Sequence, residues 1–184
     1  MIETIESQPG PQTEFLLSSA DIVIYGGAAG GGKTFGLPIE CLRHIDIPGF
    51  WSVLFRRTST QVRNPGGLWD TSVTLFPLSG GYPRESALEW EFSNGNAKVK
   101  FAHMEYDKNR FDWQGSQIPF IGFDELTHLS WEQFVYMLSR NRSTAFLAGV
   151  ISGHWHPLVR NDERVKSPLA VLSFSVRIRR INAH

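Results

Sequence analysis

The sequence predicts an α/β fold with a mainly parallel sheet, helices on both of its faces and an inserted β-hairpin. Three observations lead to this prediction. An apolar run at residues 22–25 leads into a glycine-rich loop and then a helical stretch. A second apolar run, at residues 118–123, ends in two adjacent carboxylates. Between them, residues alternate in character on both sides of Asn94-Gly95, the pattern of a hairpin. Strands that alternate with helices are typical of a mainly parallel sheet.

Composition limits the class of protein. With 184 residues, of which 41% are apolar and 12% aromatic, the chain can bury a real core. Its 18 basic and 18 acidic residues cancel, so net charge indicates neither nucleic-acid nor membrane binding. The single cysteine, Cys41, excludes a disulfide framework, fits a reducing cytoplasm and is expected in the core. No apolar run approaches about 18 residues and residues 1–11 are polar, so neither a membrane span nor a signal peptide is expected.

The glycine-rich loop fits the phosphate-binding pattern G-x-x-x-x-G-K-[ST]. Its residues are Gly27, Ala28, Ala29, Gly30, Gly31, Gly32, Lys33 and Thr34. Glycines let consecutive backbone N–H groups face one anion at the start of a helix, whose dipole favours negative charge. Lys33 is expected to reach the β- and γ-phosphates, and the Thr34 hydroxyl to bind Mg²⁺. A helix is expected from about residue 33 to 44, with a kink at Pro38. The loop predicts a P-loop NTPase.

Asp124 and Glu125 supply the second half of the prediction. Asp124 stands at the carboxyl end of its apolar strand, the same edge of the sheet to which the first strand delivers the loop. There it is expected to hold the Mg²⁺ that Thr34 also binds. Glu125 is expected to polarise the attacking water as general base. A loop of this kind together with such an acidic pair predicts Mg²⁺-dependent ATP hydrolysis.

Hydrolysis also needs a cation for the negative charge that develops on the phosphoryl oxygens. Arg56 and Arg57, at the end of an expected strand at residues 51–57, are two candidates. Arg110, which precedes the acidic pair, is the first choice.

These motifs together resemble the large terminase subunit of tailed bacteriophages, the motor that pumps DNA into the procapsid. The resemblance covers about residues 12–143. The segments that carry it, in order, are Gln12, residues 26–34, residues 54–58, residues 66–69, the Asn94-Gly95 hairpin, residues 114–117, residues 123–128 and residues 139–143.

The resemblance implies a role for several residues and partners. Gln12 would read the adenine of ATP, because an amide offers both a donor and an acceptor. Family members form rings, so Arg110 would act in a neighbouring subunit's site and the intact protein would be a homo-oligomer. Double-stranded DNA, the portal protein and the small terminase subunit would be its partners. It would act in the cytoplasm of the bacterial host, at the portal vertex of the procapsid, without a membrane.

The chain also departs from the family. The carboxylate-rich nuclease domain of a full large subunit does not fit in this length, so no nuclease activity is expected. The family also has a coupling segment, in which small hydroxyl residues and Asn-Pro follow a strand. No such segment follows the possible strand at residues 145–151. The expected organisation is a polar arm at residues 1–11, an ATPase domain at residues 12–152 and a divergent basic tail at residues 153–184. We hypothesise a reading frame disrupted near Ser143, as in a decayed prophage.

The tail allows several interpretations. His154 and His156 form an H-x-H pair, which surface histidines explain better than a metal site. Alternation through residues 169–181 could form a strand with a basic face for nucleic acid, but a solvated or poorly ordered tail is the preferred expectation.

Three functions remain open from the sequence. The first is the ATP-hydrolysing motor domain of a packaging terminase. The second is a truncated terminase fragment that binds nucleotide or partners without turnover. The third, weaker alternative is another P-loop ATPase, such as a helicase-like protein.

Overall fold

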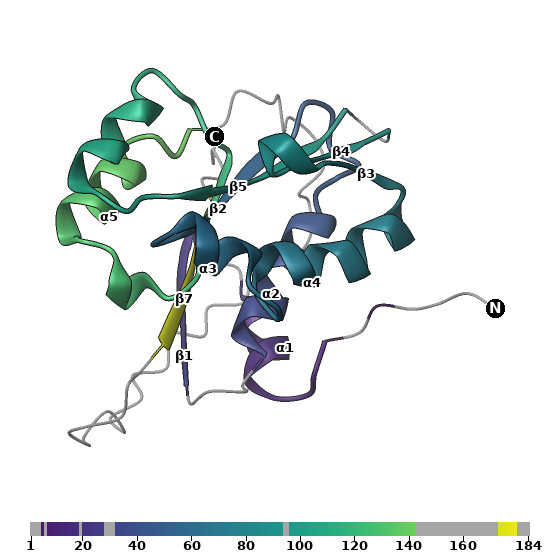
Figure 1. The fold of residues 1–184 in the computed structure, drawn as a ribbon. Helices are drawn as coiled ribbons and strands as arrows, with labels where there is room; N and C mark the ends of the chain where they lie inside the picture. Colours follow the sequence, from purple (N-terminus) through teal and green to yellow (C-terminus); the bar gives the residue numbers. More distant parts are fainter. Residues whose placement is uncertain are drawn as a thin grey trace, which may run out of the picture.

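The structure is a computed structural model that describes residues 5, 7–18, 20–27, 32–93 and 96–142 and the backbone of residues 173–179 (Figure 1). Its α-helices are α1 (Pro11–Leu17), α2 (Lys33–Leu42), α3 (Ser59–Arg63), α4 (Leu68–Leu75) and α5 (Trp131–Leu138). Its strands are β1 (Ile22–Gly27), β2 (Trp51–Arg56), β3 (Gly81–Arg84), β4 (Glu89–Phe92), β5 (Lys98–His103), β6 (Phe120–Phe123) and β7 (Ser173–Arg179). Short 3-10 helices are η1 (Phe76–Ser79), η2 (Glu85–Ala87), η3 (Asp107–Trp113) and η4 (Leu126–His128).

The strands form one seven-stranded sheet in the order β1-β7-β6-β2-β5-β4-β3. β2 lies in its centre and pairs in parallel with β5 on one side and β6 on the other. β7 is antiparallel to both β1 and β6, so β1 runs in the same direction as β6, β2 and β5. The strand that leads into the glycine-rich loop and the strand that ends in the acidic pair therefore deliver their carboxyl ends to the same edge, as expected.

The pairing of the sheet corrects one expectation and extends another. Only β2–β5 and β2–β6 are parallel neighbours, and the other four pairs are antiparallel, so the sheet is mixed and not mainly parallel. The hairpin is present, with Trp90 opposite Val99. It lies between the two motifs, as expected, and its second arm, β5, also pairs with β2 along its whole length, so that arm is part of the central sheet. A period-two pattern predicts the pairing of neighbouring strands but says nothing of the strand on the other side.

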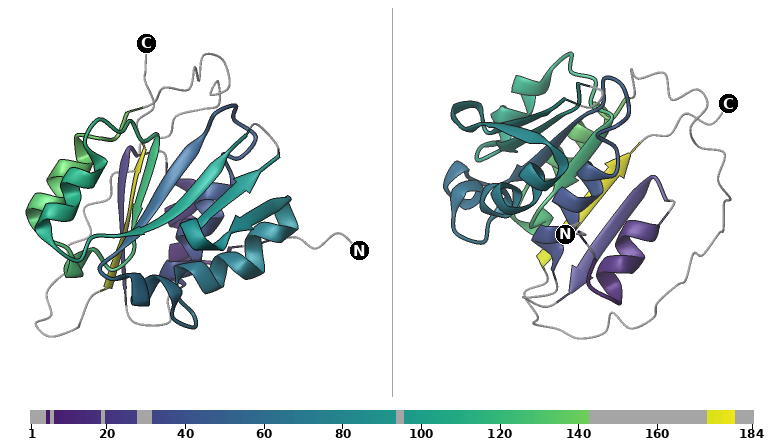
Figure 2. Two further views of the ribbon diagram at one scale, coloured as in Figure 1. Left: turned by 45° about the horizontal axis from the view of Figure 1, so that its top comes forward. Right: turned by 90° about the vertical axis from the view of Figure 1, so that its right-hand side faces the viewer.

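Helices cover both faces of the sheet, as predicted (Figure 2). Along β2, Leu54 points to the face covered by α1, α2 and α4, and belongs to the larger apolar cluster. Val53 and Phe55 point to the other face, where they pack in a second cluster with Met137 of α5. This alternation follows from the period of two in a strand, and it buries β2 on both faces.

Gly122, in the middle of β6, lets α2 approach the sheet closely. A Cβ atom at this position would lie 2.4 Å from Leu54 Cδ2 and 3.0 Å from Leu37 Cδ2. Leu37, from the second turn of α2, is fully buried. The absence of a side chain at Gly122 therefore sets how near the helix that follows the loop lies to the strand that ends at the acidic pair.

Other sequence expectations meet the structure in part. α2 continues through Pro38 but ends at Leu42, not residue 44. Cys41 is fully buried, as expected, and burial raises the pKa of its thiol to about 12. Residues 173–179 form β7, so the preferred expectation of a solvated or poorly ordered tail is wrong there. The remaining tail with His154 and His156, the expected strand at 145–151 and the Asn94-Gly95 turn lie outside the described residues.

Candidate functional site

Strand β1 and helix α2 frame the predicted phosphate loop. β1 continues to Gly27, and α2 begins at Lys33 with Gly32 as its N-cap residue. Gly32 has φ +67°, a left-handed conformation that glycine adopts at little steric cost. Lys33 and Thr34 therefore stand in the first turn of α2, and the Lys33 side chain is buried. Ala28, Ala29, Gly30 and Gly31 lie outside the described residues.

The Thr34 hydroxyl faces the carboxylate of Asp124. Its Oγ1 lies 3.2 Å from Asp124 Oδ2 and 3.4 Å from Oδ1, although 90 residues separate the two positions. Asp124 follows β6 directly, is 1% exposed, and donates its backbone N–H to the carbonyl of Phe55 in β2. The close packing of α2 on β6 at Gly122 brings these two side chains together.

The donor set at this point fits Mg²⁺. A carboxylate and a hydroxyl are hard oxygen ligands, and Mg²⁺ characteristically binds one or two such protein groups together with phosphate oxygens and water. Thr34 and Asp124 supply one of each, converging from the first turn of α2 and the end of β6. The remaining ligands would come from the nucleotide and from solvent.

Arg56, the last residue of β2, contacts both members of the acidic pair. Its Nε lies 2.8 Å from Asp124 Oδ2, and its Nη2 lies 3.3 Å from Glu125 Oε1. Its Nη1 donates to the backbone carbonyl of Gln61 in α3 at 3.2 Å. The Arg56 side chain is 14% exposed. The sequence suggested Arg56 only as one of three possible cations, because it does not reveal that β2 and β6 are neighbours.

Glu125 turns away from the line of β6. It has φ 57°, a left-handed conformation that is uncommon for a residue with a side chain, and it caps η4. Its carboxylate is 30% exposed and receives a second contact from His128, whose Nδ1 lies 3.3 Å from Glu125 Oε2. Sequence reasoning did not identify His128 as part of the site. Its position three residues after Glu125, within the same short turn, is the signal that was available.

Gln12 lies against the end of the loop. Its Nε2 donates to the Gly32 carbonyl at 2.8 Å, and its Oε1 accepts from the Gln8 backbone N–H at 2.5 Å. Only 2% of Gln12 is exposed. In this structure both ends of the amide that was expected to read adenine are engaged within the chain, and its adenine-reading role stays a prediction.

Arg110 and Arg57 lie apart from the acidic pair. Arg110 donates to the Asp107 carbonyl and its guanidinium lies 4.6 Å from the centre of the Phe111 ring, all within η3. Arg57 donates to the carbonyl of His128. Among the described residues, neither forms an ion pair with Asp124 or Glu125. Arg110 as an arginine acting in a neighbouring subunit stays a prediction.

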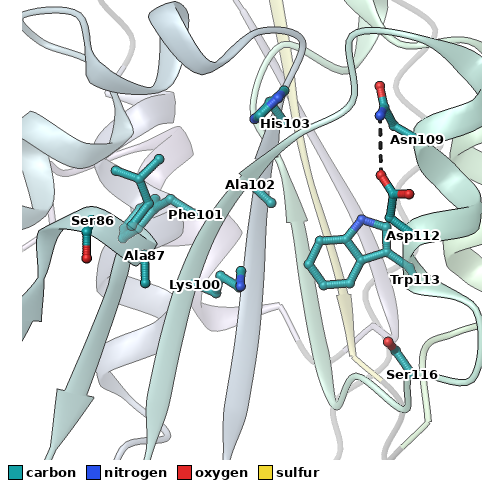
Figure 3. A pocket seen from close by; sticks show the side chains of 11 residues that line it. Ser86, Ala87, Lys100, Phe101, Ala102, His103, Asn109, Asp112, Trp113 and Ser116 are labelled. Atoms are coloured by element: carbon teal, nitrogen blue, oxygen red, sulfur yellow. Dashed lines mark hydrogen bonds between the residues drawn. The ribbon is translucent and has the colours of Figure 1, made fainter.

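A separate cavity of about 430 Å³ lies beside residues 100–103 of β5, between η2 and η3 (Figure 3). His103, Lys100 and Trp113 border it, and Asn109 donates to Asp112 across one wall. The cavity mixes positive, negative and apolar side chains. It includes neither Lys33 and Thr34 nor the acidic pair.

Two features are absent from the described part of the chain. No group of three or more histidine, cysteine or carboxylate side chains is arranged to hold a metal within it. No helix there has the length and apolar character that crossing a membrane requires.

Comparison with protein families identifies one match. The model of the N-terminal part of large terminase subunits of the T4-like virus type matches residues 24–147, which include the loop, the acidic pair and Arg56. Among curated proteins and among solved structures, no significant match is found.

Proposed function

The chain belongs to the large terminase subunit family through its N-terminal segment, and from that membership we propose that it is the Mg²⁺-dependent ATPase motor domain of a phage DNA-packaging terminase, with a P-loop NTPase fold. The observation that carries the proposal is the contact of the Thr34 hydroxyl with the buried carboxylate of Asp124 at 3.2 Å. A loop threonine and a strand-end aspartate from segments 90 residues apart meet where a nucleotide-bound cation is expected.

Each residue of the motifs has a proposed task in this function. The loop from Gly27 to Gly32 would bind the phosphates through its backbone N–H groups, and Lys33 would neutralise their charge. Thr34 and Asp124 would hold Mg²⁺, which when bound neutralises negative charge on the phosphate oxygens. Glu125, partly exposed beside the buried Asp124, would orient the attacking water and take its proton. Gln12 would support nucleotide binding, and Arg110 of a neighbouring subunit would complete the site.

The family membership also supports proposals about partners. DNA packaging would bring double-stranded DNA, the portal protein and the small terminase subunit to this chain. The work would take place in a homo-oligomeric ring at the portal vertex, in the cytoplasm of the bacterial host.

A second candidate function is nucleotide binding without turnover. The observation that favours it is that Arg56 neutralises both carboxylates on which hydrolysis would depend. If Arg56 kept its contact with Asp124 when nucleotide bound, this carboxylate would not be available to the metal and hydrolysis would not follow.

The experiment that tests the proposal is Mg-ATP hydrolysis by the purified chain, with and without double-stranded DNA. We expect Lys33→Ala to lower nucleotide affinity and turnover, and Glu125→Gln to retain binding but lower turnover by about 10²–10⁴-fold, because general-base catalysis contributes that much. Glu132→Gln is the matched control, since Glu132 is an exposed glutamate at the start of α5. Binding without turnover would favour the second candidate function, and a chain that does not bind ATP would refute both.

A further inference from the structure

Arg56 connects three segments of the chain at the acidic pair. Its guanidinium contacts Asp124, which follows β6, and Glu125 at the start of η4. It also donates to the backbone carbonyl of Gln61 in α3. Arg56 itself ends β2, the strand next to β6. Four residue pairs between these two parallel strands hold its Cα beside the acidic pair. The contact therefore follows from the order of strands in the sheet.

The contact with Asp124 is an ion pair without a directional hydrogen bond. Arg56 Nε lies 2.8 Å from Asp124 Oδ2, yet this buried nitrogen has no hydrogen-bond partner of acceptable geometry. Charge attraction alone holds the two groups at this point. A metal ion at the carboxylate would replace the guanidinium as its counter-charge, so Asp124 would not be left buried and unpaired when Arg56 leaves.

The oxygen that Arg56 contacts is also the one that Thr34 approaches. Thr34 Oγ1 lies 3.2 Å from Asp124 Oδ2. A divalent cation held by Thr34 and Asp124 would meet the guanidinium charge within a few ångströms, where like charges repel strongly inside a protein. Arg56 and the cation therefore compete for one carboxylate.

Two other contacts would hold the Arg56 guanidinium in the site after it leaves Asp124. Glu125 Oε1 lies 3.3 Å from Nη2, on a carboxylate that is 30% exposed. The Gln61 carbonyl accepts a hydrogen bond from Nη1. Gln61 itself is held at the start of α3 by a capping box with Thr58. In it, the side chain of each residue accepts a hydrogen bond from the backbone N–H of the other. The guanidinium can therefore turn toward Glu125 without leaving the site.

We propose that Arg56 is the positioning residue of the acidic pair: it neutralises Asp124 and Glu125 in the nucleotide-free chain, yields Asp124 to the nucleotide-bound metal, and remains with Glu125. This inference rests on the proposed ATPase function and names the counter-ion that the metal must displace. The displacement would couple metal binding at Asp124 to the contact of Arg56 with Glu125, because one side chain serves both carboxylates.

The test is the affinity for ADP measured with Mn²⁺ and, separately, in EDTA, by calorimetry. The quantity of interest is the ratio of the two affinities, because it isolates the contribution of the metal from that of the nucleotide. Removing the competing charge in Arg56→Gln is expected to raise this ratio about tenfold. Arg56→Lys, a single point charge that cannot span both acids, is expected to raise it about threefold. Turnover should fall in both variants.

Arg63→Gln is the matched control. Arg63 lies on α3, in the same helix as Gln61, and donates to the carbonyl of Glu85, so the same loss of charge occurs away from the acidic pair. The ratio of the ADP affinities with Mn²⁺ and in EDTA should be the same for Arg63→Gln as for the unmodified chain. A merely structural role for Arg56 would weaken binding equally with and without metal, leaving the ratio unchanged.

An unchanged or lower ratio would overturn the inference. The Lys variant provides the same comparison if Arg56→Gln does not fold. An unmodified chain that binds ADP neither with Mn²⁺ nor in EDTA would overturn the proposed function and this inference with it. Binding by the unmodified chain with an unchanged ratio in both Arg56 variants would overturn this inference alone.

Discussion

Gln12 uses its whole amide within the chain, bonding to the Gly32 carbonyl and the Gln8 N–H. Gly32 has no room for a side chain here, because a Cβ atom would lie 2.6 Å from Gln12 Nε2. The glutamine therefore acts on the end of the phosphate loop in this conformation. Whether it also reads adenine is a separate question that nucleotide selectivity answers.

For Gln12→Ala, the observed contacts predict a loss of affinity that does not depend on the base. We expect ATP and GTP to bind about threefold to tenfold more weakly, by similar factors, because a buried hydrogen bond that positions Gly32 is lost. Fluorescence titration with both nucleotides measures this. Gln114→Ala, at an exposed glutamine, should change neither affinity. A loss confined to ATP would instead support the adenine-reading role.

Helix α2 and strand β6 meet at Gly122, where the chain has no side chain to separate them. Leu37 and Leu54 occupy the space that a Cβ atom would need. Because Thr34 lies in the first turn of this helix and Asp124 directly follows this strand, the same contact determines the separation of Thr34 and Asp124. The packing of α2 on β6 in the core therefore also determines the geometry of the site.

Gly122→Ala should destabilise the chain by about 1–3 kcal/mol, the usual cost of forcing an added methyl into a packed core. Urea unfolding measures this change. Gly36→Ala, in α2, is the control: its Cβ atom would find its nearest neighbour at 3.6 Å, an ordinary contact. Alanine also favours a helix over glycine by about 1 kcal/mol, so this variant should be neutral or more stable. Equal losses in the two variants would contradict the packing argument.

Across the whole molecule, β7 joins the strand of the phosphate loop to the strand of the acidic pair. Among the described strands, β1 pairs with β7 alone, and β7 pairs with β6 on its other side. Ser173, where β7 begins, lies opposite Gly27, where β1 ends. A segment expected to be a separate tail is therefore an internal strand of the sheet, and the alignment of loop and acids depends on it.

Val176→Pro tests this connection, because Val176 lies opposite Ile24 on one side and Phe123 on the other. Proline removes a ladder hydrogen bond in an internal strand, at a cost of about 3 kcal/mol or more. We expect amide hydrogen exchange in β1 to speed up on the order of 100-fold. Val176→Thr keeps the backbone N–H and should leave exchange unchanged. Unchanged protection of β1 in the proline variant would show that β1 is held in some other way.

The sequence by itself determined those features that depend on neighbours along the chain. Local spacing and hydrophobic periodicity predict four of them. These are the loop pattern from Gly27 to Thr34, the acidic pair after an apolar run, the β4–β5 hairpin and the buried Cys41. The same local signals correctly indicated helices on both faces of the sheet. They also carried the resemblance to the large terminase subunit, the family whose model matches residues 24–147.

Only the tertiary structure decided which arginine meets the acidic pair. Arg56 and Arg110 are both plausible cations in the sequence, but β2 is the neighbour of β6, so Arg56 contacts Asp124 and Arg110 stays within η3. The tertiary structure also gave Gln12 its partners and inserted β7 between β1 and β6. The physical reason is the same in each case. Local patterns describe the faces of an element, whereas the order of strands depends on long-range packing that no single segment encodes.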